Sequence, residues 1–501
     1  MIRRVKVENG WVCGLPAADP RITSYKGIPF AAPPVGENRW RAPQPCADWQ
    51  GDYLAYDFAP IPLQVRQELD DNNIYTREWA VDPDIAMSED CLYLNIWAPA
   101  RNAKNLPVFV WYFGGGLQVG HTAEMEFDGE RIARRGIVVV TVSYRLNAFG
   151  FLCHPEITAE APEAPANFGF LDQQFATRWV KRNIAAFGGD PDNITIGGQS
   201  AGGMSVCAQM TCPANEGLFQ KAIIQSGCFA PPYPFEFGLS GTLADAEKQG
   251  EAFFEFLGVK TLAEARKIDA MTLRDKAVEW NGRWGEAVDG VFSTRNSQEW
   301  FLQEDRVRCP VLAGYTDSEF LAAPPAKNAE ELRAFAKMHF GARAEGLLAC
   351  FGEGLNEDGI RAAGSVSSID FSIQLAARTN PDDPLYAYVF AADIPGWDNP
   401  GTFHSVDLWF FFETLAKCWR PFKGRHYDLA RKMCDSWVNF IRSGDPNGAD
   451  SHGEPLPEWP PLKAGAPVRM RFDMAPAAES CRASELVNLL MDAYLERKQE
   501  G

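Results

Sequence analysis

Residues 105–227 alternate strand-like and helix-like segments, and this alternation limits the possible folds more than any other feature of the chain. Gly136–Arg145 is a near-continuous apolar run, as expected of a strand buried on both faces. Asn105–Phe113 and Lys221–Gly227 are further apolar strand candidates, and Asp172–Gly189 has helical spacing of its large apolar residues and ends in glycine. This β–α–β order predicts an α/β fold with a mostly parallel central sheet and helices on both faces.

The rest of the chain extends this pattern at both ends. An N-terminal hairpin is expected from Val5 to Cys13, and later strands are expected at Cys309–Thr316 and Pro384–Asp393. Pro467–Asp473 is expected to be the last strand, followed by a closing helix. The blocks between these strands have helical, irregular patterns. We therefore expect one domain over residues 1–501, with insertions over the active site at about 229–306 and 321–383.

The segment Gly198–Gly202 reads G-Q-S-A-G and lies between a predicted strand and a predicted helix. In this G-x-S-x-G pattern the turn holds the serine in a strained backbone conformation, so the neighbouring side chains must be small. The result is an exposed hydroxyl on Ser200 at the carboxyl edge of the sheet. The backbone N–H of Ala201 begins the next helix and can donate to an oxyanion. Ser200 is therefore the predicted nucleophile.

A nucleophilic serine needs a base, and six histidines are available. In this type of fold the chain order is serine, then acid, then histidine. His404 follows the predicted strand Pro384–Asp393 through a Gly/Pro-rich loop, which places it at a carboxyl strand end, where ligand chemistry occurs in open α/β sheets. The other histidines precede the serine or lie in a helical pattern, at a helix start or in a surface loop; these are His121, His154, His339, His426 and His452.

The orienting acid is expected in the loop after Cys309–Thr316, where Asp317 and Glu319 are nearly equal candidates from the pattern alone. The backbone N–H groups of the oxyanion hole are expected in the loop after Asn105–Phe113. Gly114–Gly116 follows that strand directly, and without Cβ atoms its backbone N–H groups are open to a ligand.

Charge and cysteine usage exclude several classes of function. The formal net charge of −18 disfavours nucleic acid and anionic membrane surfaces as partners. No apolar run is long enough to span a bilayer, and the N-terminus has no apolar core of an export signal, so we expect a cytoplasmic protein. The twelve cysteines show no metal-ligand spacing, so no metal site is expected.

Several long segments resemble the type-B carboxylesterase and cholinesterase family of α/β-hydrolases, most of all its bacterial para-nitrobenzyl-esterase-like members. The resemblance covers most of the chain. It is carried by GIPFAAPPVGENRW, SEDCLYLNIWAP, VWYFGGGLQVG, NFGFLDQQFATRWVKRNIAAFGGDPDNITIGGQSAGG, AGYTDSEF and FHSVDLWFFF.

The resemblance implies an α/β-hydrolase fold with Ser200 as nucleophile, Glu319 as acid and His404 as base. Here it decides between Asp317 and Glu319. It also implies an oxyanion hole formed by the N–H groups of Gly115, Gly116 and Ala201, and a reaction that needs no cofactor. The pocket candidates are residues near these groups, some of which depart from the family pattern: Phe113, Leu117, Gln199 and Phe320.

The expected function is a serine carboxylesterase that hydrolyses small, mainly neutral esters through an acyl-enzyme on Ser200. An amidase, a thioesterase or a carbamate hydrolase would use the same three residues and stays an alternative. A non-catalytic binding module of the cholinesterase type is an alternative from another class, but such relatives have lost the serine that this chain keeps. The sequence gives no indication of the oligomeric state.

Overall fold

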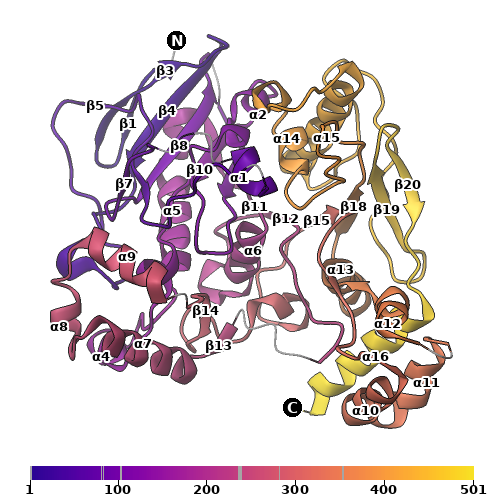
Figure 1. Cartoon of the computed structure of the whole chain (residues 1–501). Helices are drawn as coiled ribbons and strands as arrows, with labels where there is room; N and C mark the ends of the chain where they lie inside the picture. Colours follow the sequence, from indigo (N-terminus) through magenta and orange to yellow (C-terminus); the bar gives the residue numbers. More distant parts are fainter. Residues whose placement is uncertain are drawn as a thin grey trace.

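The computed structural model describes residues 3–500 except 71, 80–81, 83, 102–103, 235–239, 281 and 353–354. In this part of the chain an eleven-stranded sheet runs in the order β20-β19-β18-β15-β12-β11-β9-β10-β8-β4-β3 (Figure 1). Its strands are β3 Leu15–Pro16, β4 Ile22–Pro29, β8 Tyr93–Pro99, β9 Leu106–Tyr112, β10 Val138–Val142, β11 Gly189–Gln199, β12 Lys221–Gln225, β15 Val311–Thr316, β18 Leu385–Phe390, β19 Val468–Phe472 and β20 Ala477–Ser480.

The middle of this sheet is parallel. Every neighbouring pair from β10 across to β19 is parallel, and the antiparallel pairs lie toward the two edges, at β8, β4 and β3 on one side and at β20 on the other. The predicted mostly parallel sheet is therefore confirmed. Because parallel strands share one carboxyl edge, the segments that follow β9, β11, β15 and β18 reach the same side of the molecule.

Helices cover both faces of the sheet (Figure 1). α5 and α6 are joined by a hydrogen bond from Gln173 to Ser205, and α15 is joined to the turn after α2 by the Arg135–Asp435 ion pair. The helices of the sheet layers and their connections are α2 Glu130–Ala133, α3 Asn147–Phe151, α4 Pro155–Glu160, α5 Phe168–Asn183, η3 Ile184–Phe187, α6 Ala201–Thr211, η4 Pro213–Asn215, α14 Asp407–Phe411, η7 Leu415–Lys417, α15 Gly424–Ser443 and α16 Glu485–Glu500.

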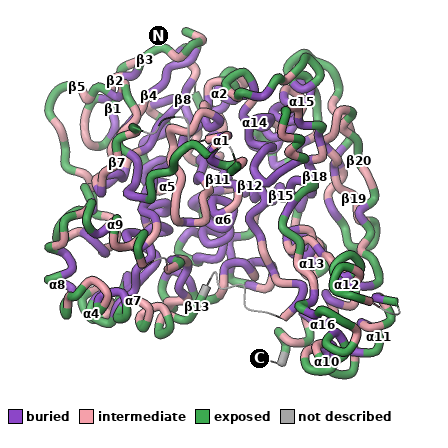
Figure 2. The backbone as a smooth tube through the Cα atoms, in the orientation of Figure 1, coloured by how far each residue is buried: buried purple, intermediate pink, exposed green. Residues whose placement is uncertain are grey.

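The two blocks predicted as insertions are largely helical. The block after β12 holds β13 Ser240–Thr242, α7 Leu243–Leu257, α8 Leu262–Ala265, α9 Ala270–Trp280, β14 Glu286–Val288 and η5 Ser297–Leu302. The block after β15 holds β16 Leu321–Ala322, α10 Ala329–Phe340, η6 Gly341–Arg343, α11 Ala344–Ala349, α12 Glu357–Gly364, β17 Val366–Ser367 and α13 Ser368–Thr379. Figure 2 shows many exposed residues in these blocks, whereas the residues of the central strands are buried.

The N-terminal third adds small elements that matter for the cavity described below. The predicted hairpin is confirmed as β1 Arg4–Val7 and β2 Gly10–Cys13, which pair antiparallel, and β5 Asp52–Leu54 joins β2. Further elements are η1 Gly36–Asn38, β6 Ile61–Pro62, α1 Ile74–Trp79, β7 Met87–Ser88 and η2 Met125–Phe127. Among the described residues, no helix combines the length and the apolar character needed to cross a bilayer.

The prediction that Pro467–Asp473 forms the last strand is wrong. β20 follows it and pairs antiparallel with β19 at the edge of the sheet. β20 consists of Ala-Ala-Glu-Ser and lacks the β-branched and aromatic residues that mark a strand in sequence, so only its pairing with β19 reveals it.

Candidate functional site

The strand-to-helix turn after β11 presents Ser200. Ser200 has φ 55° and ψ −125°, a conformation that few non-glycine residues adopt, and its backbone N–H donates to the Gln225 carbonyl at 2.8 Å. The glycines around it are needed for space. A Cβ at Gly202 would lie 2.1 Å from the Tyr112 carbonyl oxygen, so only glycine lets α6 pack this close to β9.

Three backbone N–H groups in the loop after β9 and in the serine turn lack a hydrogen-bond partner among the described residues, and of their residues Gly115 lines the cavity. Gly115 and Gly116 have φ of 102° and 64°, which suits glycine and turns the loop after β9 sharply. Ala201 is the first residue of α6, where an N–H has no partner within its own helix. Within the described part of the chain, the N–H groups of these three residues make no hydrogen bond.

His404 and Glu319 are in direct contact at the carboxyl ends of β18 and β15. His404 Nδ1 lies 2.8 Å from Glu319 Oε2 and 2.9 Å from Oε1, and the Thr316 hydroxyl donates to Oε1 at 3.2 Å. Burial acts to raise the pKa of Glu319, but the interaction with His404 and the hydrogen bonds of Ser226 and Thr316 together outweigh it, and the pKa is lowered. Glu319 is therefore held as a carboxylate that can keep the Nδ1 proton in place.

Asp317, the other acid candidate, does not reach the histidine. Its side chain is exposed and lies 3.5 Å from Arg471 on the protein surface. The two acids lie only two residues apart, yet the turn after β15 directs Glu319 inward and Asp317 outward.

The second ring nitrogen of His404 contacts Gln199. The Gln199 side-chain nitrogen lies 3.2 Å from His404 Nε2, and Gln199 is 2% exposed. With a proton on Nδ1 facing Glu319, Nε2 accepts the hydrogen bond from the Gln199 amide. Among the described residues, the Ser200 hydroxyl makes no hydrogen bond in this state, so Gln199 occupies the nitrogen that a general base would use.

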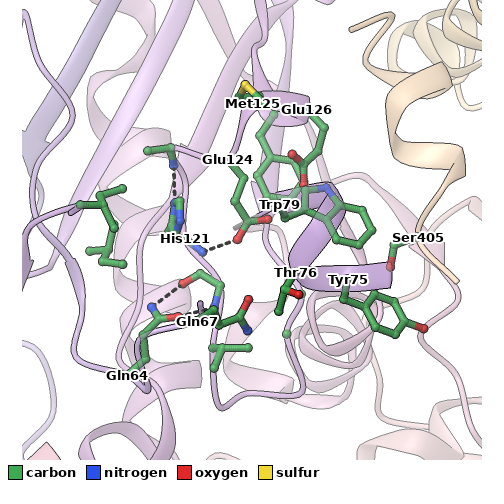
Figure 3. Close-up of a pocket in the computed structure, with 18 of the residues that line it drawn as sticks. Gln64, Gln67, Tyr75, Thr76, Trp79, His121, Glu124, Met125, Glu126 and Ser405 are labelled. Atoms are coloured by element: carbon green, nitrogen blue, oxygen red, sulfur yellow. Dashed lines mark hydrogen bonds between the residues drawn. The ribbon is translucent and has the colours of Figure 1, made fainter. Parts of the chain in front are cut away.

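Ser200, Gln199 and His404 line a cavity of about 730 Å³. Figure 3 shows part of its wall, which comes mainly from α1 and the loops of the N-terminal third, with Ser405 from the segment after β18. Sequence reasoning missed these residues, which include Gln64, Gln67, Tyr75, Thr76, Trp79, His121, Glu124, Met125 and Glu126. These residues belong to no catalytic motif. In the sequence, the clusters of aromatic and acidic residues at 75–82 and 124–126 are the feature that could have indicated a binding site.

Buried ion pairs hold α1 against the loop that carries His404. Arg420 and Glu78 form a pair at 2.5 Å in which neither side chain is exposed, and Arg420 also lies 2.9 Å from Asp398. Arg77 of α1 pairs with the same Asp398. Because α1 carries Trp79 at its end, this network fixes one side of the cavity relative to His404.

The four pocket candidates lie in different surroundings. Gln199 lines the cavity, whereas the other three are not among its lining residues. Phe113 is fully buried with its ring stacked on Tyr144, and Leu117 is also buried, in the loop after the glycines. Phe320 is 57% exposed, with its ring centroid 5.1 Å from that of His404.

The first insertion contacts the loop after β9 through the Gln118 side chain, which donates to the Trp284 carbonyl at 2.6 Å.

Among the residues that the structure describes, no group of three or more His, Cys, Asp or Glu side chains is suited to hold a metal ion.

Known proteins resemble this chain in sequence and in fold. A model of the carboxylesterase family matches residues 3–339 and 362–487. A fumonisin B1 esterase of Sphingopyxis macrogoltabida is 32% identical over 464 residues, which are 88% of this chain and 81% of that protein. A cholinesterase of Mus musculus is 28% identical over 510 residues, covering 91% of this chain and 81% of that protein.

Solved structures agree with these matches. A PNB esterase has a TM-score of 0.77 and 28% identity, covering 98% of this chain and all of that one. A carboxylesterase of Geobacillus stearothermophilus has a TM-score of 0.74 and 28% identity, covering 97% of this chain and 99% of that one.

Proposed function

The chain belongs to the carboxylesterase family and is a carboxylic ester hydrolase, and we propose that it acts through an acyl-enzyme on Ser200. The observation that carries this proposal is the convergence of three strand ends. Ser200 and His404 line one cavity, Glu319 bonds the far nitrogen of His404, and unpaired N–H groups of Gly115 and Ala201 lie beside the serine turn.

In the first half of the reaction, the Ser200 hydroxyl takes the place of the Gln199 amide at His404 Nε2. Ser200 Oγ then attacks the ester carbonyl carbon while His404 takes its proton. Glu319 stabilises the doubly protonated ring that forms, and the N–H groups of Gly115, Gly116 and Ala201 stabilise the oxyanion. His404 gives the proton to the departing alcohol.

In the second half, water attacks the acyl-enzyme with His404 again as the base. Ser200 regains its proton and the carboxylic acid leaves, so one ester and one water give one acid and one alcohol. No step needs a metal or an organic cofactor.

The proposed substrates are small, mainly neutral carboxylic esters. The cavity of about 730 Å³ accommodates a small ester, and the residue beside the nucleophile is the uncharged Gln199. One relative is named for fumonisin B1 and another is a cholinesterase, so a substrate panel is required. Chromogenic esters of graded acyl length, run beside an anilide, a thioester and a carbamate, separate an esterase from the alternatives that share the acyl-enzyme.

The proposal is tested by Ser200→Ala. We expect kcat for a short-chain p-nitrophenyl ester to fall by about 10⁴-fold or more in a folded protein, because the acyl-enzyme cannot form. Ser205→Ala is the matched control, since Ser205 does not line the cavity. Its buried hydroxyl bonds the Ala201 carbonyl and accepts from Gln173, so we expect this variant to lose stability but to keep turnover. Near-normal turnover by Ser200→Ala would refute the assignment. An active-site phosphonate should attach to Ser200, as mass spectrometry of peptides can show.

We further propose that the chain is one domain with insertions at about 229–306 and 321–383, which is supported by one buried apolar cluster with members from Val5 to Tyr494. The cytoplasmic location and the lack of nucleic-acid or membrane partners stay predictions from the sequence. Fractionation of the native host, with activity assayed in each fraction, tests the location.

A further inference from the structure

A positively charged side chain lies against the glycine loop, Gly114–Gly116, which the proposed reaction uses for its oxyanion hole. Arg283 belongs to the first insertion and lies between α9 and β14 (Figure 1). Among the described residues, its Nη2 is the atom nearest to a Cβ built on Gly116, at 3.6 Å. The guanidinium group therefore lies beside a glycine whose N–H is proposed to bind the ester carbonyl oxygen.

Two glutamine side chains hold the backbone of Arg283 and of its neighbour in place. The Gln118 amide nitrogen donates to the Gly116 carbonyl at 3.1 Å and to the Trp284 carbonyl at 2.6 Å, so one side chain joins the glycine loop to this segment. Gln249 of α7 donates to the Arg283 carbonyl at 3.1 Å. Because these bonds involve only the backbone of the segment, the guanidinium group itself stays available to a ligand.

The Arg283 guanidinium has no partner of its own in the described part of the chain. It makes no hydrogen bond and no ion pair there, although the chain carries 66 acidic against 48 basic residues. The side chain is exposed to solvent. A guanidinium group presents its N–H donors in a planar fork that matches the two oxygens of a carboxylate. Arg283 therefore offers a carboxylate ligand a binding partner that no described side chain uses.

The two acidic residues that follow Arg283 most closely in the chain have other partners. Glu286 is buried and accepts hydrogen bonds from the hydroxyls of Ser293 and Ser297. Asp289 accepts from three backbone N–H groups of the turn that follows it. Neither carboxylate pairs with Arg283, so its positive charge beside the oxyanion hole is not cancelled within its own segment.

The position of Arg283 limits where a substrate carboxylate can lie. Gly115 lines the catalytic cavity together with Ser200, whereas Gly116 and Arg283 are not among its lining residues. A carboxylate that reaches Arg283 must therefore extend beyond this lining from an ester group held at Ser200. The length of the chain between the carboxylate and the ester decides whether both groups fit at once.

We propose that Arg283 forms a subsite for a free carboxylate carried by the ester substrate. The inference rests on the proposed function, since it adds a second contact for a substrate whose ester group lies at Ser200. The part of the substrate beside Ser200 and Gln199 stays uncharged, and the carboxylate lies several bonds away. The chemistry is the same for half-esters of dicarboxylic acids and for acylated hydroxy acids, and the test distinguishes the two.

The test compares esters that differ only in the terminal group. Monobutyl esters of dicarboxylic acids of graded chain length are assayed beside butyl esters with a terminal carboxamide, which have the same shape and no charge. Acid release is followed in a pH-stat at one ionic strength, because salt screens both an ion pair and the repulsion by the net charge of −18. The measured quantity is kcat/KM for the carboxylate divided by kcat/KM for the carboxamide. Butyrate esters of hydroxy acids and of the corresponding hydroxy amides give the same ratio for the alcohol half.

Arg283→Met removes the charge and keeps much of the length of the side chain. At the chain length that reaches the subsite, we expect it to lower the ratio by about 5-fold, because an ion pair exposed to solvent contributes modestly. Arg283→Lys keeps the charge but not the planar fork and should give an intermediate ratio. An unchanged ratio in Arg283→Met at every chain length and in both halves would overturn the proposal. An equal loss of kcat/KM for carboxylate and carboxamide also overturns it, because Arg283 then supports the glycine loop and not a carboxylate.

Lys276→Met is the matched control. Lys276 lies on α9 in the same insertion and loses the same charge, but it pairs with Glu279. If Lys276→Met lowers the ratio as much as Arg283→Met, the effect is one of net charge and the proposal fails.

Calorimetry on the Ser200→Ala protein separates this inference from the proposed function. Binding of a monobutyl ester that weakens by about 5-fold when Arg283→Met is added supports the subsite even if Ser200 is not the nucleophile. Ser200-dependent hydrolysis whose carboxylate-to-carboxamide ratio does not depend on Arg283 supports the esterase and overturns the subsite.

Discussion

Two walls of one cavity are built in different ways. The strand-end wall includes Gly114, Gly115, Ser200 and His404, which lie in the segments after β9, β11 and β18 of the parallel sheet. Glu319, after β15, lies behind His404. The loop wall consists of the cavity-lining residues of 58–87 and 119–127, which include Trp79, Glu124 and Glu126. The first wall is held by backbone geometry and close packing of glycines, and the second by buried ion pairs between distant side chains.

The two walls have different roles in the proposed function: the strand-end wall carries the catalytic groups, and the loop wall contacts the rest of the substrate. The strand-end wall holds the groups that the proposed acyl transfer needs, and its geometry tolerates little change. The loop wall holds the side chains that would contact the remainder of a substrate. It is supported by the buried ion pairs of Arg420, and a substitution can remove these pairs without changing the serine turn. Substitutions in the two walls should therefore affect different quantities.

The largest effect is expected at the packing of the serine turn. Gly202→Ala would place a Cβ 2.1 Å from the Tyr112 carbonyl, so we expect the protein to lose ester hydrolysis or to fail to fold. Gly424→Ala, also in the first turn of a helix, is the control, because its Cβ would meet no atom within 4 Å. Circular dichroism and p-nitrophenyl ester turnover measure both outcomes. An active, stable Gly202→Ala would remove the distinction between the walls.

The next effect tests the acid. Glu319→Gln should lower kcat/KM by about 10²–10⁴-fold, because the amide cannot stabilise protonated His404. Asp317→Asn, two residues earlier on the exposed side of the same loop, should change it less than about 3-fold. If kcat/KM falls more in Asp317→Asn than in Glu319→Gln, Asp317 and not Glu319 orients the base.

A smaller effect is expected when the support of the loop wall is cut. Arg420→Met leaves the buried carboxylate of Glu78 without its cation, whereas Asp398 keeps its pair with Arg77. We expect the free energy of unfolding to fall by about 3–5 kcal/mol. Arg425→Met is the control, since its pair with Asp393 is exposed to solvent and should contribute about 1 kcal/mol or less. Urea unfolding measures both. Hydrogen exchange should rise in residues 74–79 of Arg420→Met, while phosphonate labelling of Ser200 continues in the folded protein.

The smallest effect concerns Gln199, which lines the cavity beside Ser200 and contacts His404. We expect neutral esters to be preferred over choline esters of matched shape, because the residue beside Ser200 has no charge. Gln199→Glu should narrow the gap by adding a local carboxylate, whose effect in a partly dry site exceeds that of the screened net charge. The measurement is kcat/KM for a choline ester and its carbon isostere at two salt concentrations. A clear preference of the unmodified enzyme for the choline ester would contradict this.

The sequence predicted the strand-end wall better than the loop wall for a physical reason. Ser200, Glu319 and His404 each follow a strong apolar strand pattern, so their shared edge of the sheet could be inferred without coordinates. Trp79 ends a six-residue helix, and the burial of Glu126 depends on packing that no local pattern encodes. The Gln199–His404 contact was also missed, because it depends on a side-chain rotamer. The resemblance separated Glu319 from Asp317, where residue patterns alone left them nearly even.

The order of strands in the sheet has a consequence for refolding. The glycine loop, Ser200, Glu319 and His404 are far apart along the chain and meet only when β9, β11, β12, β15 and β18 lie side by side. Pairings between such distant segments form slowly and late compared with helices. During renaturation from urea, hydrolysis of a fluorogenic ester should therefore return after the helical circular dichroism signal. The time at which activity returns then reports when the sheet is complete.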